Sequence, residues 1–107
     1  MKDYNELSDF EINCEVLEVF SPDIKHMCLS GDNTCFYDCG PVGDGWDQID
    51  IPDYCNSPSA AWPIIVGNRI NLTTCVDLWV ANRSVFQQYN ENPLRAAMIV
   101  FLMMKEG

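Results

Sequence analysis

The stretch NPLRAAMIVFLMM, residues 92–104, decides the fold of this chain. Asn92 is a favourable N-cap and Pro93 suits the first helical position, so the stretch predicts a helix from about Leu94 to Met104. The helix is apolar on nearly every side, which is typical of a helix buried at the centre of a domain. It has about half of the roughly 20 residues that a membrane span needs. Either the rest of the chain or a second copy has to cover it, so the sequence also allows a homodimer.

The first predicted helix covers residues 9–20. Ser8 and Glu11 have the spacing of a capping box, in which each side chain accepts from the other residue's backbone amide. Apolar residues then recur at three- and four-residue intervals, and glutamates occupy the opposite side. We therefore expect an amphipathic helix that shows water an acidic face.

A second helix is predicted to begin after Ser57, with Pro58 in the first helical position. Pro63 lies too deep in this helix to occupy a free first-turn position, so it is expected to bend or shorten the helix. Gly67 and Asn68 predict that the helix ends in a left-handed cap or a turn.

Four strands are predicted between these helices. Residues 26–30 and 34–38 have the pattern of a hairpin, and residues 69–76 and 78–84 are rich in β-branched or aromatic side chains. Glycine and proline punctuate residues 39–57, which predicts a long acidic loop. The order α-ββ-loop-α-ββ-α predicts one α+β domain, a small layered sandwich with an antiparallel sheet packed against helices.

The negative charge is concentrated in the first half of the chain. Residues 1–53 hold thirteen of the sixteen acidic side chains against Lys2 and Lys25, a net charge of −11, whereas the remaining residues carry +1. A one-sided negative field attracts cationic partners and repels phosphate, so direct binding to nucleic acid is not expected. The acidic start MKDYNELSDF has no apolar core segment, which predicts a cytoplasmic protein that does not enter a membrane.

Six cysteines leave three interpretations open. Cys35 and Cys39 are close in sequence and Cys28 precedes them, but the chain has no CxxC pair, so a metal site is only weakly supported. Disulfides are a further alternative. Cys14 and Cys75 fall within apolar patterns and are predicted to be buried thiols. Free thiols are therefore favoured over a metal site and over disulfides.

No catalytic motif is recognisable in the chain. It lacks a phosphate-binding glycine loop, a nucleophile elbow and a metalloprotease helix. His26 is the only histidine, and although Cys28 would share its strand face, no third group would orient the pair. We therefore expect a non-enzymatic protein that has no catalytic residue and needs neither a cofactor nor a metal.

The acidic half and the aromatic residues beside it form the predicted partner-binding surface, because aromatic side chains anchor interfaces and charges steer association. An acidic loop can also simply be solvated, or bind calcium weakly, and Tyr54 can instead be a core residue. We favour a negative surface that imitates a phosphate track and occupies a basic nucleic-acid-binding surface. Its predicted residues are Glu11, Glu15, Glu18, Asp38, Asp44, Trp46, Asp47, Asp50, Asp53 and Tyr54.

Three stretches resemble a known family: YNELSDFEIN at residues 4–13, DYCNSPSAAWPIIVGNRINL at residues 53–72, and residues 92–104. They are similar to the NinX-like proteins of lambdoid phages and prophages, a family of unknown function. The wider group is described as small α-β-α sandwich domains. The resemblance implies a phage protein that acts in the bacterial cytoplasm. Small acidic accessory phage proteins often inhibit host defences, including CRISPR effector complexes. By analogy, we expect the same kind of role for this chain.

We therefore expect a phage accessory protein that inhibits a host defence system, above all as an anti-CRISPR. Two alternatives remain. The first is a small-molecule binding protein that sequesters a nucleotide signal, for which Arg69, Arg83 and Arg95 would have to supply the cations. The second is a regulatory partner of a phage recombination or transcription protein.

Overall fold

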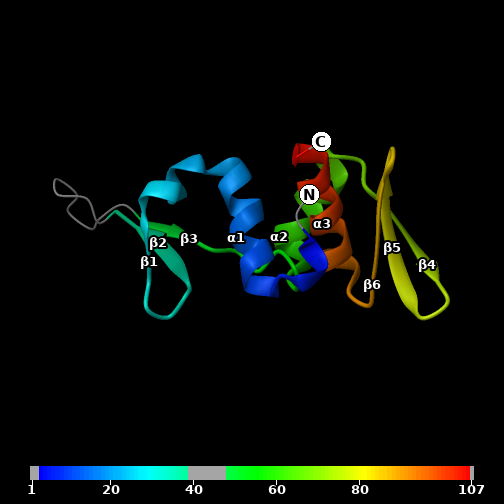
Figure 1. Ribbon diagram of the computed structural model, residues 1–107, viewed down its shortest axis with the longest axis horizontal. Helices are drawn as coiled ribbons and strands as arrows, with labels where there is room; N and C mark the ends of the chain where they lie inside the picture. The colour runs from blue at the N-terminus through cyan, green and yellow to red at the C-terminus, as the bar shows by residue number, and fades with distance from the viewer. Residues whose placement is uncertain (1–2, 39–47, 107) are drawn as a thin grey trace.

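Helix α3 (Pro93–Glu106) forms the centre of the computed structural model, which describes residues 3–38 and 48–106. All side chains from Ala96 to Leu102 are buried. Two other helices and one antiparallel sheet pack on this helix (Figure 1). The chain therefore covers the apolar helix with its own elements, as the all-round apolar pattern requires.

Helix α1 (Asp9–Phe20) has the predicted bounds and the predicted start. The amide of Glu11 donates to the Ser8 hydroxyl at 3.1 Å, and the amide of Ser8 donates to the Glu11 carboxylate at 3.0 Å. These two bonds confirm the capping box. A short 3₁₀ helix, η1 (Tyr4–Glu6), precedes α1, and a second, η2 (Pro22–His26), follows it.

Helix α2 (Pro58–Gly67) is present as predicted, and Pro63 is accommodated inside it. Its two ends differ from the expectation. The Ser57 side chain makes no capping hydrogen bond. Asn68 has a φ of −103°, and it is Arg69, with a φ of 54°, that adopts the left-handed conformation. The turn is thus displaced by one residue, because the Asn68 amide still bonds back to the helix.

The larger sheet is antiparallel and consists of β4 (Asn71–Cys75), β5 (Leu78–Arg83) and β6 (Phe86–Asn90), with β5 in the middle. Strand β6 was not predicted, because it is short and largely polar and its pairing with β5 is what makes it a strand. One face of the sheet packs against α3. The hydrophobic side chains that this face adds to the core are Leu72, Ala81 and Phe86.

A smaller antiparallel sheet contains β1 (Cys28–Leu29), β2 (Cys35–Tyr37) and β3 (Gln48–Asp50) in that order. The first two strands confirm the predicted hairpin, although they are shorter. Strand β3 lies within the segment predicted to be a loop, and it pairs with β2. His26, predicted to lie in a strand, belongs to η2 instead.

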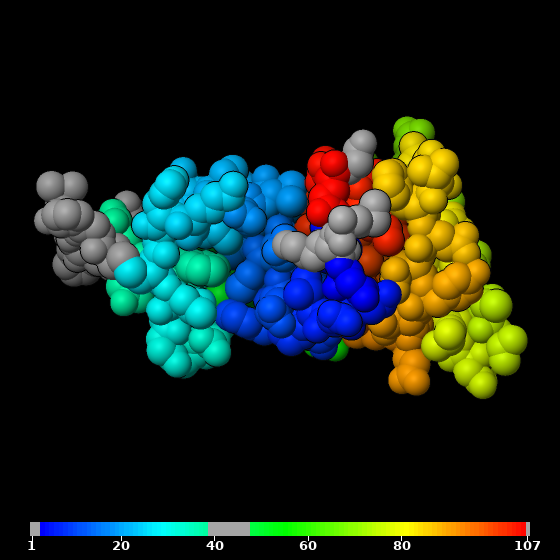
Figure 2. Space-filling view, viewed as in Figure 1, coloured from blue at the N-terminus to red at the C-terminus, as the bar shows by residue number. Residues whose placement is uncertain are grey.

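The two sheets lie at opposite ends of an elongated molecule that measures 52 × 26 × 25 Å, with the helices between them (Figure 1). The space-filling view shows the same separation, with the cyan N-terminal sheet at one end and the yellow and orange sheet at the other (Figure 2). The small sheet is therefore separated in space from the larger sheet, whereas the acidic helix α1 lies between them and packs on α3. Within the described residues, no helix is long and apolar enough to cross a membrane.

Candidate partner-binding site

A groove of about 300 Å³ lies between α1, η2 and the small sheet. Its lining combines carboxylates with apolar side chains, a combination that suits a partner that is both cationic and partly apolar. The carboxylates come from one side of α1, and β2 contributes an aromatic ring. The lining residues are Leu7, Phe10, Glu11, Cys14, Glu15, Glu18, Ile24, Lys25 and Phe36.

The helical repeat explains why three glutamates meet in this groove. Glu11, Glu15 and Glu18 are four and three residues apart, a spacing that places them on one side of α1. Successive glutamates are thus about 4.5–6 Å apart along the helix axis. The Lys25 ammonium lies 3.6 Å from the Glu18 carboxylate, but the lysine side chain is 63% exposed, so the pair is weak. The groove therefore stays acidic.

The groove also contains a thiol that is not activated for catalysis. Burial raises the pKa of Cys14, and the charges of Glu15 and Glu11 raise it further. A reactive cysteine requires the opposite, a positive environment that stabilises the thiolate. Cys14 is therefore a packing residue in the groove wall.

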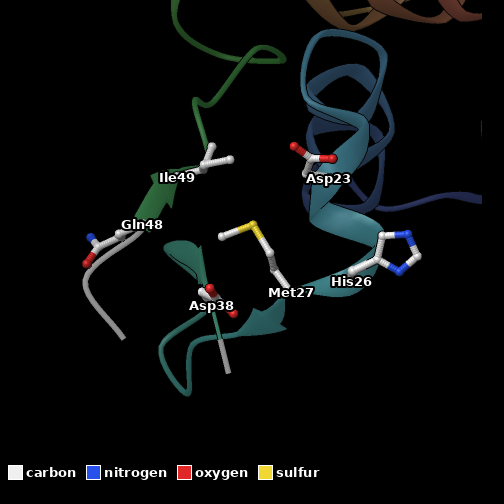
Figure 3. A pocket seen from close by; sticks show the side chains of 6 residues that line it. All are labelled: Asp23, His26, Met27, Asp38, Gln48 and Ile49. Atoms are coloured by element: carbon white, nitrogen blue, oxygen red, sulfur yellow. The ribbon is translucent and has the colours of Figure 1, made fainter. Parts of the chain in front are cut away.

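A second hollow, of about 520 Å³, lies on the other side of η2 (Figure 3). The Met27 side chain extends between the small sheet and η2. The His26 ring points away from the Met27 side chain. Two carboxylates line this hollow as well, so its charge has the same sign as that of the groove. The lining residues are Asp23, His26, Met27, Asp38, Gln48 and Ile49.

The predicted site residues fall into distinct places. The three glutamates share the groove, whereas Asp38 lines the second hollow. Asp50 is exposed on β3 and accepts a hydrogen bond from Gln48 at 3.1 Å. Three further predicted residues, Asp44, Trp46 and Asp47, lie outside the described residues.

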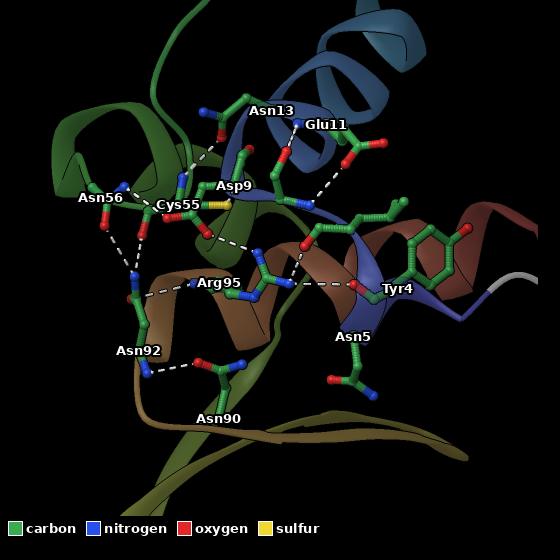
Figure 4. A network of polar contacts seen from close by, with 12 residues as sticks. Tyr4, Asn5, Asp9, Glu11, Asn13, Cys55, Asn56, Asn90, Asn92 and Arg95 are labelled. Atoms are coloured by element: carbon green, nitrogen blue, oxygen red, sulfur yellow. Dashed lines mark hydrogen bonds and ion pairs between the residues drawn. The ribbon is translucent and has the colours of Figure 1, made fainter.

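Tyr54 and Asp53 have structural surroundings that the sequence did not reveal. Tyr54 is only 8% exposed, so it belongs to the core and is not a surface anchor, in agreement with the alternative interpretation. Asp53 accepts a hydrogen bond from the Asn13 side chain at 3.1 Å. The Asn13 side-chain oxygen in turn accepts one from the amide of Cys55 (Figure 4). Asp53 thus ties its segment to α1 while its side chain remains exposed to water.

The cysteines do not form a functional cluster in the described residues. Cys14, Cys35, Cys55 and Cys75 are free thiols, whereas Cys28 is disulfide-bonded, contrary to the favoured expectation. Cys75 is exposed, so the prediction that it is a core thiol was wrong: it ends β4 on the face turned away from α3. Cys39 lies outside the described residues, among which no group of three or more His, Cys, Asp or Glu side chains is arranged to hold a metal ion.

Phe36 is one of the aromatic residues that flank the acidic region in the sequence, but neither its place in the groove nor that of Ile24 was indicated by the sequence. Their side chains come from β2 and η2, and they reach α1 through packing between segments that are distant in sequence. Only the alternation of the β2 strand hinted that Phe36 faces one side, and it could not show which element covers that side.

One family model, described as Bacteriophage P22, NinX, matches residues 3–105 of the chain. No curated protein and no solved structure gives a significant match.

Proposed function

Because the chain belongs to the NinX family of bacteriophage P22, we propose that it is a phage accessory protein that disables a host defence complex by binding, without catalysis, to its basic nucleic-acid-binding surface. A CRISPR surveillance complex is the first target to test. The protein would occupy the surface that nucleic acid needs, and its carboxylates would stand in for phosphates.

The acidic and apolar groove beside α1 supports this proposal most. Glu11, Glu15 and Glu18 line it together with Phe10 and Phe36. Surfaces that bind nucleic acid carry lysine and arginine, often with aromatic side chains between them. Such a surface complements this groove in both charge and apolar character, and the excess negative charge of residues 1–53 would speed association over longer distances.

The same charge argues against the nucleotide-binding alternative. Both hollows at this end of the molecule are lined by carboxylates, which repel phosphate groups. Arg95, one of the three arginines that a nucleotide would require, is already paired with Asp9 at 2.7 Å.

Capture of host proteins on the immobilised full-length chain, with elution in a salt gradient, tests the proposal. The test variant is E11Q/E15Q/E18Q, which removes three charges from the groove and keeps the capping box, because glutamine also serves at that position. The matched control is E6Q/D77N/E91Q, which removes the same number of charges from exposed residues that do not line the groove.

We expect the unchanged protein and the control to retain a nucleic-acid-binding host complex that moderate salt releases, and the groove variant to lose most of it. The captured complex should also lose its binding to nucleic acid. Equal capture by the groove variant and the control would contradict the role of the groove. Capture of phage proteins alone would favour the regulatory alternative instead.

A further inference from the structure

Helix α2 exposes large apolar side chains that do not line the acidic groove. Trp62 is 57% exposed and Val66 is 55% exposed, and they lie one helical turn apart. Phe20, at the end of α1, is 55% exposed although its ring stacks on Phe101 with centroids 5.7 Å apart. Large apolar side chains gathered in this way are typical of interaction surfaces.

A shallow, mostly apolar groove of about 440 Å³ runs between Phe20 and α2, beside the face of the helix that carries Trp62 and Val66. Phe20 and Tyr54 form one side of it, and α2 forms the other. On the side of α2 the groove is lined by Ala60, Pro63, Ile64, Gly67 and Asn68. The small or compact residues among them, Ala60, Pro63 and Gly67, recur every three or four positions, so another helix can approach closely.

The surface carries no charge, which distinguishes it from the rest of this acidic protein. No residue from Tyr54 to Asn68 is charged, although the whole chain has a net charge of −10. Two copies of the chain repel each other wherever their acidic halves meet. Contact through α2 keeps the acidic halves apart and so lessens that repulsion, whereas a strongly cationic partner would find no opposite charge on α2 itself.

From these observations we infer that α2 is the interface of a homodimer, in which the α2 helices of two copies pack against each other. A two-fold interface requires a projecting side chain and a matching depression on the same surface. Trp62 provides the projection, and the groove beside Pro63 provides the depression. Each Trp62 enters the partner's groove, and Val66 packs across the symmetry axis.

The available area indicates a weak, reversible dimer. Trp62, Phe20 and Val66 together expose about 300 Å² in each copy, judged from the roughly 150–250 Å² that an aromatic side chain can bury. Two copies therefore offer about 600 Å² through these side chains, which is below the standard interface size of roughly 1,200–2,000 Å². Dimerisation should therefore depend on concentration in the micromolar range.

Sedimentation velocity of the full chain, from low to high micromolar concentration, tests the inference. The test variant is Val66→Asp, which places a charge in the interface. The matched control is Val85→Asp, which adds the same charge at a valine that is 86% exposed in the turn between β5 and β6. Circular dichroism of both variants establishes that they are folded.

We expect the 12.2 kDa chain and the Val85→Asp control to approach twice the monomer mass with rising concentration, while Val66→Asp stays monomeric. Added salt should strengthen the dimer because it screens the repulsion between the acidic halves. Binding to the proposed basic partner should instead weaken with added salt, so the dimer and the partner binding can be tested, and can fail, separately. A chain that stays monomeric throughout, or equal effects of the two valine variants, would overturn the dimer.

Discussion

The guanidinium of Arg95 lies 2.7 Å from the carboxylate of Asp9 and joins the first turn of α3 to the first turn of α1, 86 residues apart in sequence (Figure 4). The same guanidinium donates to the backbone carbonyl oxygens of Leu7 and Tyr4. The side chain of Arg95 is only 13% exposed, so these acceptors replace most of its water. Arg95 therefore fixes the N-terminal segment to the central helix.

Replacing Arg95 by alanine should lower the free energy of unfolding by about 2–3 kcal/mol, because a partly buried carboxylate and two carbonyls lose their donor. The lower part of the range for buried pairs applies, since Asp9 remains 44% exposed and can be hydrated. Urea unfolding followed by circular dichroism measures the change. Arg83→Ala, at an exposed residue that ends β5, is the control and should cost less than about 0.5 kcal/mol. Equal losses in the two variants would show that Arg95 acts only as a surface charge.

The capping residues provide a second prediction. Ser8→Ala should cost about 1 kcal/mol, because the Glu11 amide loses the hydroxyl that accepts its hydrogen bond at 3.1 Å. Ser57→Ala, at the start of α2, should cost less than about 0.5 kcal/mol, since the Ser57 side chain makes no capping bond there. Thermal or urea unfolding of the two variants compares them directly. A larger loss for Ser57→Ala would contradict the cap assignment.

These caps also explain which parts of the fold could be predicted. The capping box at Ser8 and the Asn92-Pro93 pair are local signals, and the helices that follow them begin where the sequence indicates. Strands β3 and β6 lack such signals. Gln48–Asp50 and Phe86–Asn90 are short and polar, and they become strands only because β2 and β5 offer free edges.

The candidate site was also predictable only where local sequence signals determine it. The spacing of Glu11, Glu15 and Glu18 placed them on one helical face before any tertiary structure was considered. The pattern could not show that Phe36 would lie across from them, or that Tyr54 would be buried, because both depend on contacts between distant segments. The charge pattern thus indicated the glutamates that line the groove, whereas the position of Phe36 opposite them depends on the tertiary fold.

The turn between β4 and β5 holds a strained valine. Val76 has a φ of 55°, a left-handed conformation that is unfavourable for a β-branched residue, and it is 95% exposed. Val76→Gly should therefore stabilise the protein by about 0.5–1 kcal/mol: relief of about 1–2 kcal/mol of strain exceeds the extra entropy of the unfolded chain. Nothing buried is lost by this change.

Val85 provides the matched control for the strained turn. It is also exposed, at 86%, but it is not among the residues with positive φ. Val85→Gly should therefore destabilise the protein by about 0.5–1 kcal/mol, through the entropy of the unfolded chain alone. Melting temperatures that move in opposite directions for the two glycine variants would support the assignment, and two parallel losses would contradict it.

Cys55 predicts how stability changes at alkaline pH. The residue is fully buried, and burial, with the nearby charge of Asp9, raises the pKa of its thiol to about 12 from an ordinary value of 9.0. The folded state thus favours the protonated thiol. Its contribution to stability is fully present below about pH 9 and is lost as the pH rises from about 9 towards 12.

Between about pH 9 and 12, the free energy of unfolding of the unchanged protein should fall more steeply with pH than that of Cys55→Ala. The difference in slope should reach up to about 1.4 kcal/mol per pH unit, because unfolding of the unchanged protein releases one proton from the thiol. Burial also raises the pKa of Tyr4 and Tyr54, but both proteins share those groups. The difference between the two curves therefore isolates Cys55, even though the alanine variant is less stable at neutral pH. Urea unfolding from pH 8 to about pH 10.5 measures it over a range in which the thiol dominates the difference. Curves that remain parallel above pH 9 would mean that the thiol ionises as easily in the folded protein as in the unfolded chain, and that its burial against the first turn of α1 is not maintained in solution.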